Sequence, residues 1–147
     1  MSITPKTAPA LRAPSSLEAQ GWTRPLASNF LDHVGPIWMK PGEDGFRVGF
    51  VVEEKHDNTQ RRSHGGMIMT LCDDGMGHAA QAARKGEQLF TVAFDCQFIS
   101  GAQHGEFVEV VCEVVRSTRS LVFMRSTCLV GDRVVATASG IWKVLSK

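Results

Sequence analysis

The sequence predicts an α+β domain in which one long buried helix packs against a strongly curved antiparallel β-sheet. Three observations support this fold class. Residues 64–84 form an apolar run rich in Met, Leu and Ala without a proline, which favours a buried helix. After this run the apolar residues recur with a period of two, which indicates strands. The links between these strands are short, as is typical of antiparallel neighbours.

The composition is that of one ordinary globular domain. The chain has 147 residues, a net charge of +1 and 43% hydrophobic residues, which argues against disorder and gives no bulk charge for nucleic acid or an anionic membrane. No apolar run approaches the roughly 20 residues of a membrane span, and no compact signal core is visible near the N-terminus, so we expect a cytoplasmic protein. The cysteines are widely spaced with no CxxC pair, which predicts buried free thiols and no metal site; they are Cys72, Cys96, Cys112 and Cys128.

The first part of the chain predicts an arm followed by the domain. Residues 1–15 carry three prolines among small and polar residues, which indicates a flexible arm, and residues 16–147 are expected to form the single domain. Apolar residues over 16–33 have mostly helical spacing interrupted by Pro25, which predicts a short, broken helix. The elements expected before the long helix are a strand start over 34–39, a turn over 41–45 and a half-buried strand over 46–52.

The residues after the long helix predict four consecutive strands. Gly86 is expected to end the helix as a left-handed C-cap. In the strand over 90–98, Phe90, Val92, Phe94, Cys96 and Phe98 fall on one face, and Thr91, Ala93, Asp95 and Gln97 fall on the other. Asp95 and Gln97 would then either line a pocket with Thr91 or be hydrated. Three further strands, over 107–115, 121–130 and 134–144, complete an antiparallel meander with turns over 101–105, 117–120 and 131–132.

A His-Gly-Gly step precedes the long helix, and two carboxylates lie in its middle. Gly65 and Gly66 leave N–H groups at the positive end of the helix dipole, where they can hold a carbonyl oxygen or an oxyanion. The simpler interpretation is that these glycines only let the helix pack closely. Asp73 and Asp74 are costly to bury unless they are paired or used. They point about 100° apart on a helix, and Asp74 can pair with His78 at i+4.

Helix geometry separates the glycine step from the first carboxylate. Asp73 lies eight residues after Gly65, which is about 12 Å along one helix. One substrate carbonyl cannot touch both groups, so a shared role would require a second copy of the chain. The functional interpretation therefore implies a two-fold dimer with shared sites, whereas a structural role for the glycines allows a monomer.

The combination of Asn58, His64-Gly65-Gly66, Asp73 and Thr91 resembles the hotdog-fold acyl-CoA thioesterases of the phenylacetate-pathway (PaaI-like) type, which are akin to one class of 4-hydroxybenzoyl-CoA thioesterase. The resemblance covers about residues 30–144, and the spacing of these residues carries it. Family loops often have a glycine and then a leucine before the histidine, whereas this chain has Arg61-Arg62-Ser63.

The resemblance implies a role for each matching residue. The Gly65 N–H would polarise the thioester carbonyl, and Asp73 of the other subunit would be the nucleophile or would activate water. Asn58 would position that water or the leaving sulfur, and Thr91 would assist the water or orient the acid. His64 would shape the loop by hydrogen bonds more than transfer protons. The residues expected to bind substrate or coenzyme A are Gly66, Arg61, Arg62, Arg116, Ser117, Thr118 and Arg119. The alternatives are a solvated loop for Arg61 and Arg62 and a turn with exposed arginines over 116–119.

We therefore expect a thioesterase that hydrolyses an acyl-CoA, or a related acyl thioester, to a free acid and a thiol. No metal or redox cofactor is expected, and coenzyme A would enter as part of the substrate. The expected assembly is a homodimer that pairs into a dimer of dimers, without nucleic acid or membrane partners. Two alternatives remain open: a hotdog enoyl-CoA hydratase or dehydratase, and a non-catalytic protein that binds acyl-CoA.

Overall fold

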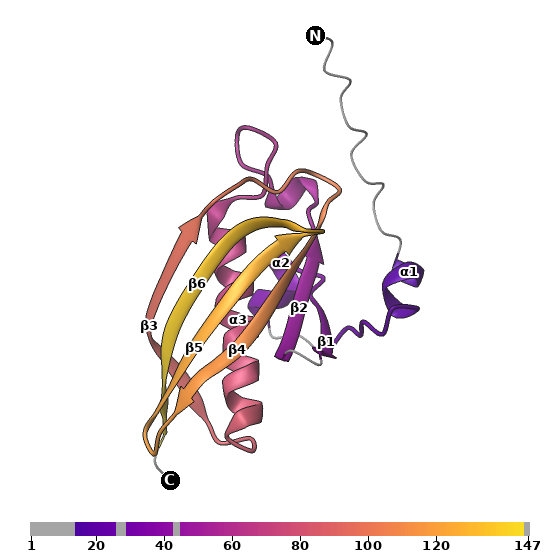
Figure 1. Cartoon of the computed structure of the whole chain (residues 1–147). Coiled ribbons are helices and arrows are strands. Elements are labelled where there is room, and N and C mark those ends of the chain that lie inside the picture. The colour runs from indigo at the N-terminus through magenta and orange to yellow at the C-terminus, as the bar shows by residue number, and fades with distance from the viewer. Residues whose placement is uncertain (1–13, 26–28, 43–44, 146–147) are drawn as a thin grey trace.

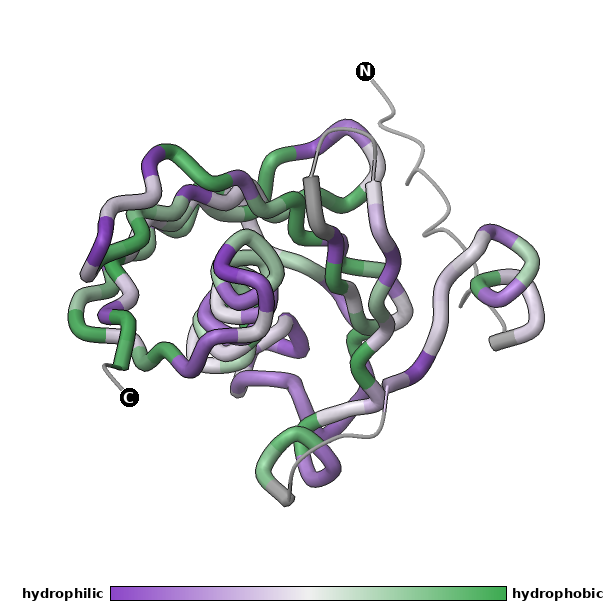
Figure 2. Tube along the Cα trace, turned by 90° about the horizontal axis from the view of Figure 1, so that it is seen from below, coloured by the Kyte–Doolittle hydropathy of each residue, from purple (hydrophilic) through white to green (hydrophobic). Residues whose placement is uncertain are grey.

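A six-stranded antiparallel sheet curves around the long helix α3 (Gly65–Ala83) in the computed structural model (Figure 1). The structure describes residues 14–25, 29–42 and 45–145. Viewed at right angles to Figure 1, α3 lies inside the curve of the sheet (Figure 2). The predicted α+β class, with one long helix against a curved antiparallel sheet, is confirmed.

Helix α3 has a closed side and an open side. The closed side packs on the sheet, and its buried residues are Met67, Ile68, Leu71, Cys72, Gly75, Met76, Ala79 and Ala80. At Gly75 the helix and sheet approach so closely that a Cβ atom would lie 2.6 Å from Val48 Cγ2 and 3.0 Å from Cys112 Sγ. On the open side, Met69 is 38% exposed and Asp73 and Gly77 are only half-buried. The sheet therefore covers one side of a helix that is apolar on most of its circumference.

The C-terminal end of α3 turns into the left-handed region one residue earlier than predicted. Lys85 has φ +53° and Gly86 has φ +85°. The Gly86 N–H donates to Gln81 O at 2.9 Å, and the Lys85 N–H donates to Ala82 O at 3.1 Å. This is the paired pattern of a Schellman motif, in which Lys85 occupies the left-handed position and Gly86 follows it.

The strands are β1 (Trp38–Gly42), β2 (Gly45–Val51), β3 (Leu89–Phe98), β4 (Phe107–Ser117), β5 (Leu121–Val130) and β6 (Arg133–Val144). Their order in the sheet is β1-β2-β4-β5-β6-β3. The predicted meander is therefore correct for β4, β5 and β6 but wrong for β3, which pairs with β6 at the far edge. The link between β3 and β4 crosses the end of β6, where the Ile99 and Ser100 N–H groups both donate to Val135 O.

A β-bulge in β3 reverses which residues face the helix. The register with β6 shifts between Thr91 and Ala93. Thr91 donates a hydrogen bond to Asp73 on α3, yet Phe94 and Cys96 also pack against the core around α3. The prediction that residues 90, 92, 94, 96 and 98 share one face is wrong, because a bulge inserts one unpaired residue and reverses the alternation beyond it.

The bulge also moves two polar residues away from the predicted pocket. Asp95 pairs with Ser139 and Gln97 pairs with Thr137 across the β3–β6 ladder. These partners lie on the side of the sheet that faces away from α3, where Asp95 lines a surface cavity. Asp95 and Gln97 therefore do not share the face of Thr91.

The N-terminal segment forms two short helices instead of one broken helix. These are α1 (Pro14–Glu18) and α2 (Asn29–Val34), and a 3-10 turn, η1 (Glu54–His56), precedes the loop that leads to α3. A second apolar cluster on the outer side of the sheet contains Leu17, Trp22, Trp38 and Phe107. Most of the predicted flexible arm, residues 1–13, lies outside the described residues.

The cysteine thiols are free, as predicted. Cys72, Cys112 and Cys128 are buried and Cys96 is half-buried. The Sγ atoms of Cys72 and Cys128 lie 3.1 Å apart between α3 and β5. Across the described ranges, no helix is both long and apolar enough to span a membrane.

Candidate active site

The start of α3 presents one open N–H group. His64 is the N-cap, and its Nδ1 accepts a hydrogen bond from the Gly66 N–H at 2.9 Å. A Cβ atom on Gly66 would lie 3.0 Å from this Nδ1, so a larger residue at position 66 would crowd the imidazole cap. Within the part of the chain that the structure describes, the Gly65 N–H has no hydrogen-bond acceptor. The donor at Gly65 is thus available for a ligand, while His64 fixes the turn.

Phe98 closes one side of this glycine step. A Cβ atom on Gly65 would lie 3.0 Å from Phe98 Cζ, so the aromatic ring stands directly against the helix start. Phe98 itself is 55% exposed at the end of β3. The apolar pattern of residues 90–98 did not predict this neighbour, because the pattern does not reveal the bulge in β3.

Asn58 shapes the loop before α3. Its Oδ1 accepts hydrogen bonds from the Gln60 N–H at 2.8 Å and the Arg62 N–H at 3.2 Å. The oxygen of this amide therefore holds the loop, and its NH2 group is the part that is left to contact a ligand. Arg61, which has φ +57°, and Arg62 are both exposed on the same loop.

Asp73 and Thr91 form the central pair of the open side. The Thr91 Oγ1–H donates to Asp73 Oδ1 at 2.7 Å, which orients the carboxylate. Both residues line a cavity of about 340 Å³ between α3, β3 and β6. Its other lining residues are Asp74, Gly77, His78, Gln81, Leu89, Phe90 and Trp142.

Asp74 pairs with His78, as the i+4 spacing predicts. His78 Nε2 lies 3.4 Å from Asp74 Oδ1, and the side chain of Asp74 is 17% exposed. The hydrogen bond with Asp74 raises the pKa of His78 above its ordinary value, against the opposing effect of burial. Asp74 Oδ2 is buried without a partner among the described residues.

A second cavity, of about 450 Å³, lies at the N-terminal end of α3. It is lined by residues of α2, the loop and the helix start, including His56, His64, Gly66 and Met67. His56 is buried, and burial lowers its pKa below the ordinary value. Its carbonyl oxygen accepts the His64 N–H at 2.7 Å, which ties η1 to the cap of α3.

The two arginine-containing loops lie at opposite ends of α3. Arg61 and Arg62 are near the helix start, whereas the hairpin over 116–119 lies at the helix end, where Arg84 Nη1 donates to Thr118 O at 3.2 Å. Within one chain, the structure brings Asp73 to Thr91 and His64 to Gly66. It does not bring the Gly65 donor to the Asp73 carboxylate, and it does not bring the two arginine groups together.

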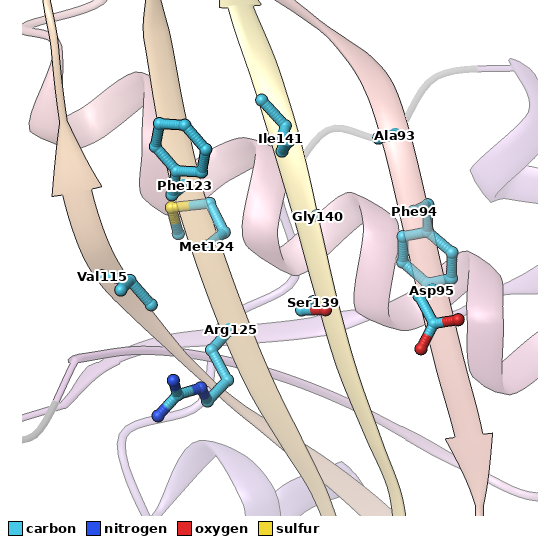
Figure 3. A pocket seen from close by; sticks show the side chains of 10 residues that line it. All are labelled: Ala93, Phe94, Asp95, Val115, Phe123, Met124, Arg125, Ser139, Gly140 and Ile141. Atoms are coloured by element: carbon cyan, nitrogen blue, oxygen red, sulfur yellow. The ribbon is translucent and has the colours of Figure 1, made fainter.

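A third cavity, of about 390 Å³, lies on the outer face of the sheet (Figure 3). Figure 3 shows Phe123, Arg125, Ser139 and Asp95 around it. None of the predicted catalytic residues lines this cavity. Chemistry at Asp73 therefore belongs to the inner cavities along α3.

A long helix inside a curved antiparallel sheet, with a His-Gly-Gly cap and a carboxylate on its open side, defines a hotdog-fold protein. The family model described as "Thioesterase superfamily" matches residues 62–137. A Pseudomonas aeruginosa protein named "Putative esterase PA0474" is 32% identical over 120 residues, which are 79% of this chain and 88% of that protein. The chain therefore belongs to the thioesterase superfamily.

Solved structures of low identity share the fold. A mutant of the phenylacetic acid degradation protein PaaI from Thermus thermophilus superposes with a TM-score of 0.72 at 18% identity, covering 80% of this chain and 100% of that chain. The structure of smu.793 from Streptococcus mutans UA159, bound to acetyl CoA, has a TM-score of 0.67 at 22% identity and covers 74% of this chain and 88% of that chain.

Proposed function

We propose that this protein is a thioesterase that hydrolyses an acyl-CoA, or a related acyl thioester, to a free acid and a thiol. The single observation that carries the proposal is the carboxylate of Asp73, which is held by Thr91 in a cavity on the same open side of α3 as the unpaired Gly65 N–H. An oriented carboxylate and an open N–H donor are the two groups that acyl transfer to water needs.

The proposed reaction uses these groups in one of two ways. Asp73 either removes a proton from a water that attacks the carbonyl carbon, or attacks that carbon itself to give an anhydride that water then opens. In both cases the carbonyl oxygen becomes an oxyanion near the Gly65 N–H, and the C–S bond breaks. The sulfur leaves as a thiolate and takes up a proton, while the acyl group leaves as a carboxylate.

A two-fold dimer would unite the separated groups. On α3, Met69 is midway between Gly65 and Asp73 and is 38% exposed. An axis through this level, perpendicular to the helix, would place Gly65 of one copy level with Asp73 of the other, because each lies about 6 Å from it along α3. On β3, Thr91 lies next to Asp73 and Phe98 lies next to Gly65. The same axis would therefore pass β3 near Phe94, midway between these two residues.

The exposed edge of β3 supports such pairing. This ten-residue strand pairs only with β6, and its other edge has no strand partner among the described residues. Phe90 and Val92 are 46% and 48% exposed on it. Monomeric proteins usually protect long apolar edges, so a second β3 in antiparallel orientation is the occupant we propose.

Coenzyme A is the proposed carrier of the acyl group. The same two-fold operation would bring the helix end of one copy, with Arg116 and Arg119, near the loop of the other, with Arg61 and Arg62. Arginine clusters suit phosphate groups, which acyl-CoA carries. The acetyl CoA in the structure of smu.793 is a further support for this class of ligand.

Hydrolysis tests the proposal directly. The purified protein is incubated with a panel of acyl-CoAs, and free thiol is measured with a thiol reagent. We expect Asp73→Asn and Asp73→Ala to lower kcat/KM by at least about 100-fold, as loss of an essential acid–base group does, and Thr91→Val to lower it less. Full activity in both Asp73 variants would end the Asp73 assignment, and turnover of an enoyl-CoA or binding without turnover would select one of the alternative functions.

Mixed dimers test the shared site. A chain with Asp73→Asn retains Gly65 and its open N–H donor, and a chain with Gly65→Val retains the Asp73 carboxylate. Each is expected to be inactive alone. Random mixing of the two chains should restore about one quarter of the wild-type activity, because half of the dimers are mixed and each has one intact site. No recovery in mixtures that contain mixed dimers would contradict a site built from two chains.

A further inference from the structure

We infer that His78 is a positioning residue that acts through Asp74: it pairs with this second carboxylate and offsets its negative charge beside Asp73. This inference rests on the proposed function of Asp73. Asp73 and Asp74 are consecutive residues, and both line the cavity of about 340 Å³. Two negative charges that share a partly buried site disfavour each other's ionisation. The carboxylate that performs the chemistry therefore needs a neighbour whose charge is compensated.

His78 is suited to this compensation by its position. Among the residues that line the cavity, it is the one that can carry a positive charge. It lies one helical turn after Asp74, with Nε2 at 3.4 Å from Asp74 Oδ1. This pairing orients the Asp74 carboxylate toward the C-terminal end of α3. Thr91 holds Asp73 through a separate hydrogen bond of 2.7 Å. The two carboxylates thus have different partners, and only the partner of Asp74 can be charged.

The other titratable groups around Asp74 do not supply this charge. On β4, the thiol of Cys112 lies near the helix, and burial together with Cys72 and Asp74 raises its pKa, so it stays neutral. The thiols of Cys96 on β3 and Cys128 on β5 contact Cys72, and neither cysteine is among the residues that line the cavity. The cavity residues from β3 and β6 are Leu89, Phe90, Thr91 and Trp142, which are uncharged.

A second copy would add two kinds of charged group. Its Arg61 and Arg62 are unchanged in every variant compared below, so their effect on the site is the same in all of them. Its His64, whose Nδ1 accepts the Gly66 N–H, would lie level with Asp74. Because His64 is present in every variant compared below, its effect cancels in a double-mutant comparison.

The kinetic test is a pH profile of kcat/KM for four proteins: wild type, His78→Gln, Asp74→Asn and the double variant. The measured quantity is the ratio of kcat/KM at pH 8 to that at pH 5. We expect His78→Gln to raise this ratio about threefold, because loss of the positive charge shifts the acidic decline to higher pH. In the Asp74→Asn background, the same histidine substitution should leave the ratio unchanged.

A charge-matched control separates local from general electrostatics. Arg125 lies on the outer face of the sheet and pairs with Glu113 at 3.3 Å. Arg125→Gln also removes a positive charge, yet its ratio should equal that of wild type. An unchanged ratio in His78→Gln, or an equal rise with and without Asp74, would overturn the inference. A purely structural role for His78 would lower activity or stability at all pH values without changing the ratio.

A second readout does not depend on turnover. The titration of the His78 ring is followed by NMR in wild type, Asp73→Asn and Asp74→Asn. Because Asp74 is the main cause of the raised pKa, Asp74→Asn should lower the pKa of His78 more than Asp73→Asn does. Equal or absent shifts would overturn the pairing. If wild type hydrolyses no thioester, the proposed function and the kinetic role of His78 fail together, whereas this titration still decides the pairing.

Discussion

The closed and open sides of α3 use the same helix for different purposes. On the closed side, a Cβ atom at Gly75 would lie 2.6 Å from Val48, whereas on the open side a Cβ atom at Gly77 would meet its nearest neighbour, Trp142 Nε1, at 3.3 Å. The closed side contains apolar groups in tight contact, and the open side contains Asp73, Asp74 and His78. The closed side thus supplies stability, and the open side keeps polar groups available at the surface of that core.

The largest difference should appear when one large side chain is shortened on each side. Leu71 is fully buried on the closed side, and Met69 is 38% exposed on the open side. We expect Leu71→Ala to lower the free energy of unfolding by about 3 kcal/mol, because it leaves a cavity. Met69→Ala should cost less than about 1 kcal/mol in the isolated chain. Urea denaturation at low protein concentration measures both, and equal losses would contradict the division into two sides.

Adding a single methyl group gives an intermediate effect. Gly75→Ala forces contact with a strand side chain and with Cys112, so we expect a loss of about 1–3 kcal/mol in the free energy of unfolding. Gly77→Ala improves helix propensity and meets a looser neighbour, so its net effect should stay within about 0.5 kcal/mol. Thermal denaturation of the two variants compares them, and a larger loss at Gly77 would reverse the assignment of the tight side.

The smallest effect concerns two histidines, His56 and His78, whose pKa values shift in opposite directions. Burial lowers the pKa of His56 below about 6.5 in the folded chain, so the unfolded chain gains a proton first and stability is lost as the pH falls below that value. The bond with Asp74 raises the pKa of His78, so its contribution is complete below about 6.5 and is lost as the pH rises through the folded value.

Unfolding measured between pH 5 and pH 8 checks these signs. In His56→Gln, the loss of stability toward acid should be smaller than in wild type. In His78→Gln, the decline toward alkaline pH should be smaller instead. The second change is expected to be slight, because the side chain of His78 is 41% exposed and solvent screens its interaction. The opposite pattern in either variant would contradict the corresponding pKa direction.

Local patterns in the sequence predicted most of the secondary structure. The apolar run predicted α3, and the alternation of valines predicted β4, β5 and β6, because period and composition are local properties. The i+4 spacing similarly predicted the pairing of Asp74 with His78. The resemblance implied that Thr91 assists the water or orients the acid, and the structure shows a hydrogen bond from Thr91 to Asp73.

Features that depend on distant parts of the chain were not predictable in this way. Nothing in residues 89–98 indicates that β3 joins β6 and leaves β4, because sheet order depends on how the whole chain closes around α3. The alternation of apolar residues does not reveal the bulge between Thr91 and Ala93 either. The predicted faces of Asp95, Gln97 and Phe98 were therefore wrong. To predict the contact between Phe98 and Gly65, one would need to know both the sheet order and the bulge.

The bulge in β3 has a consequence for anyone who edits this strand. It shifts the alternation by one residue, so odd-numbered residues face α3 before the bulge and even-numbered residues face it after Ala93. Without the bulge, the same ten residues would alternate strictly, so either Asp95 would turn toward the apolar interior or Thr91 would turn away from Asp73. One unpaired residue at this point thus lets the edge strand present the Thr91 hydroxyl group to the carboxylate while Asp95 stays on the outer face.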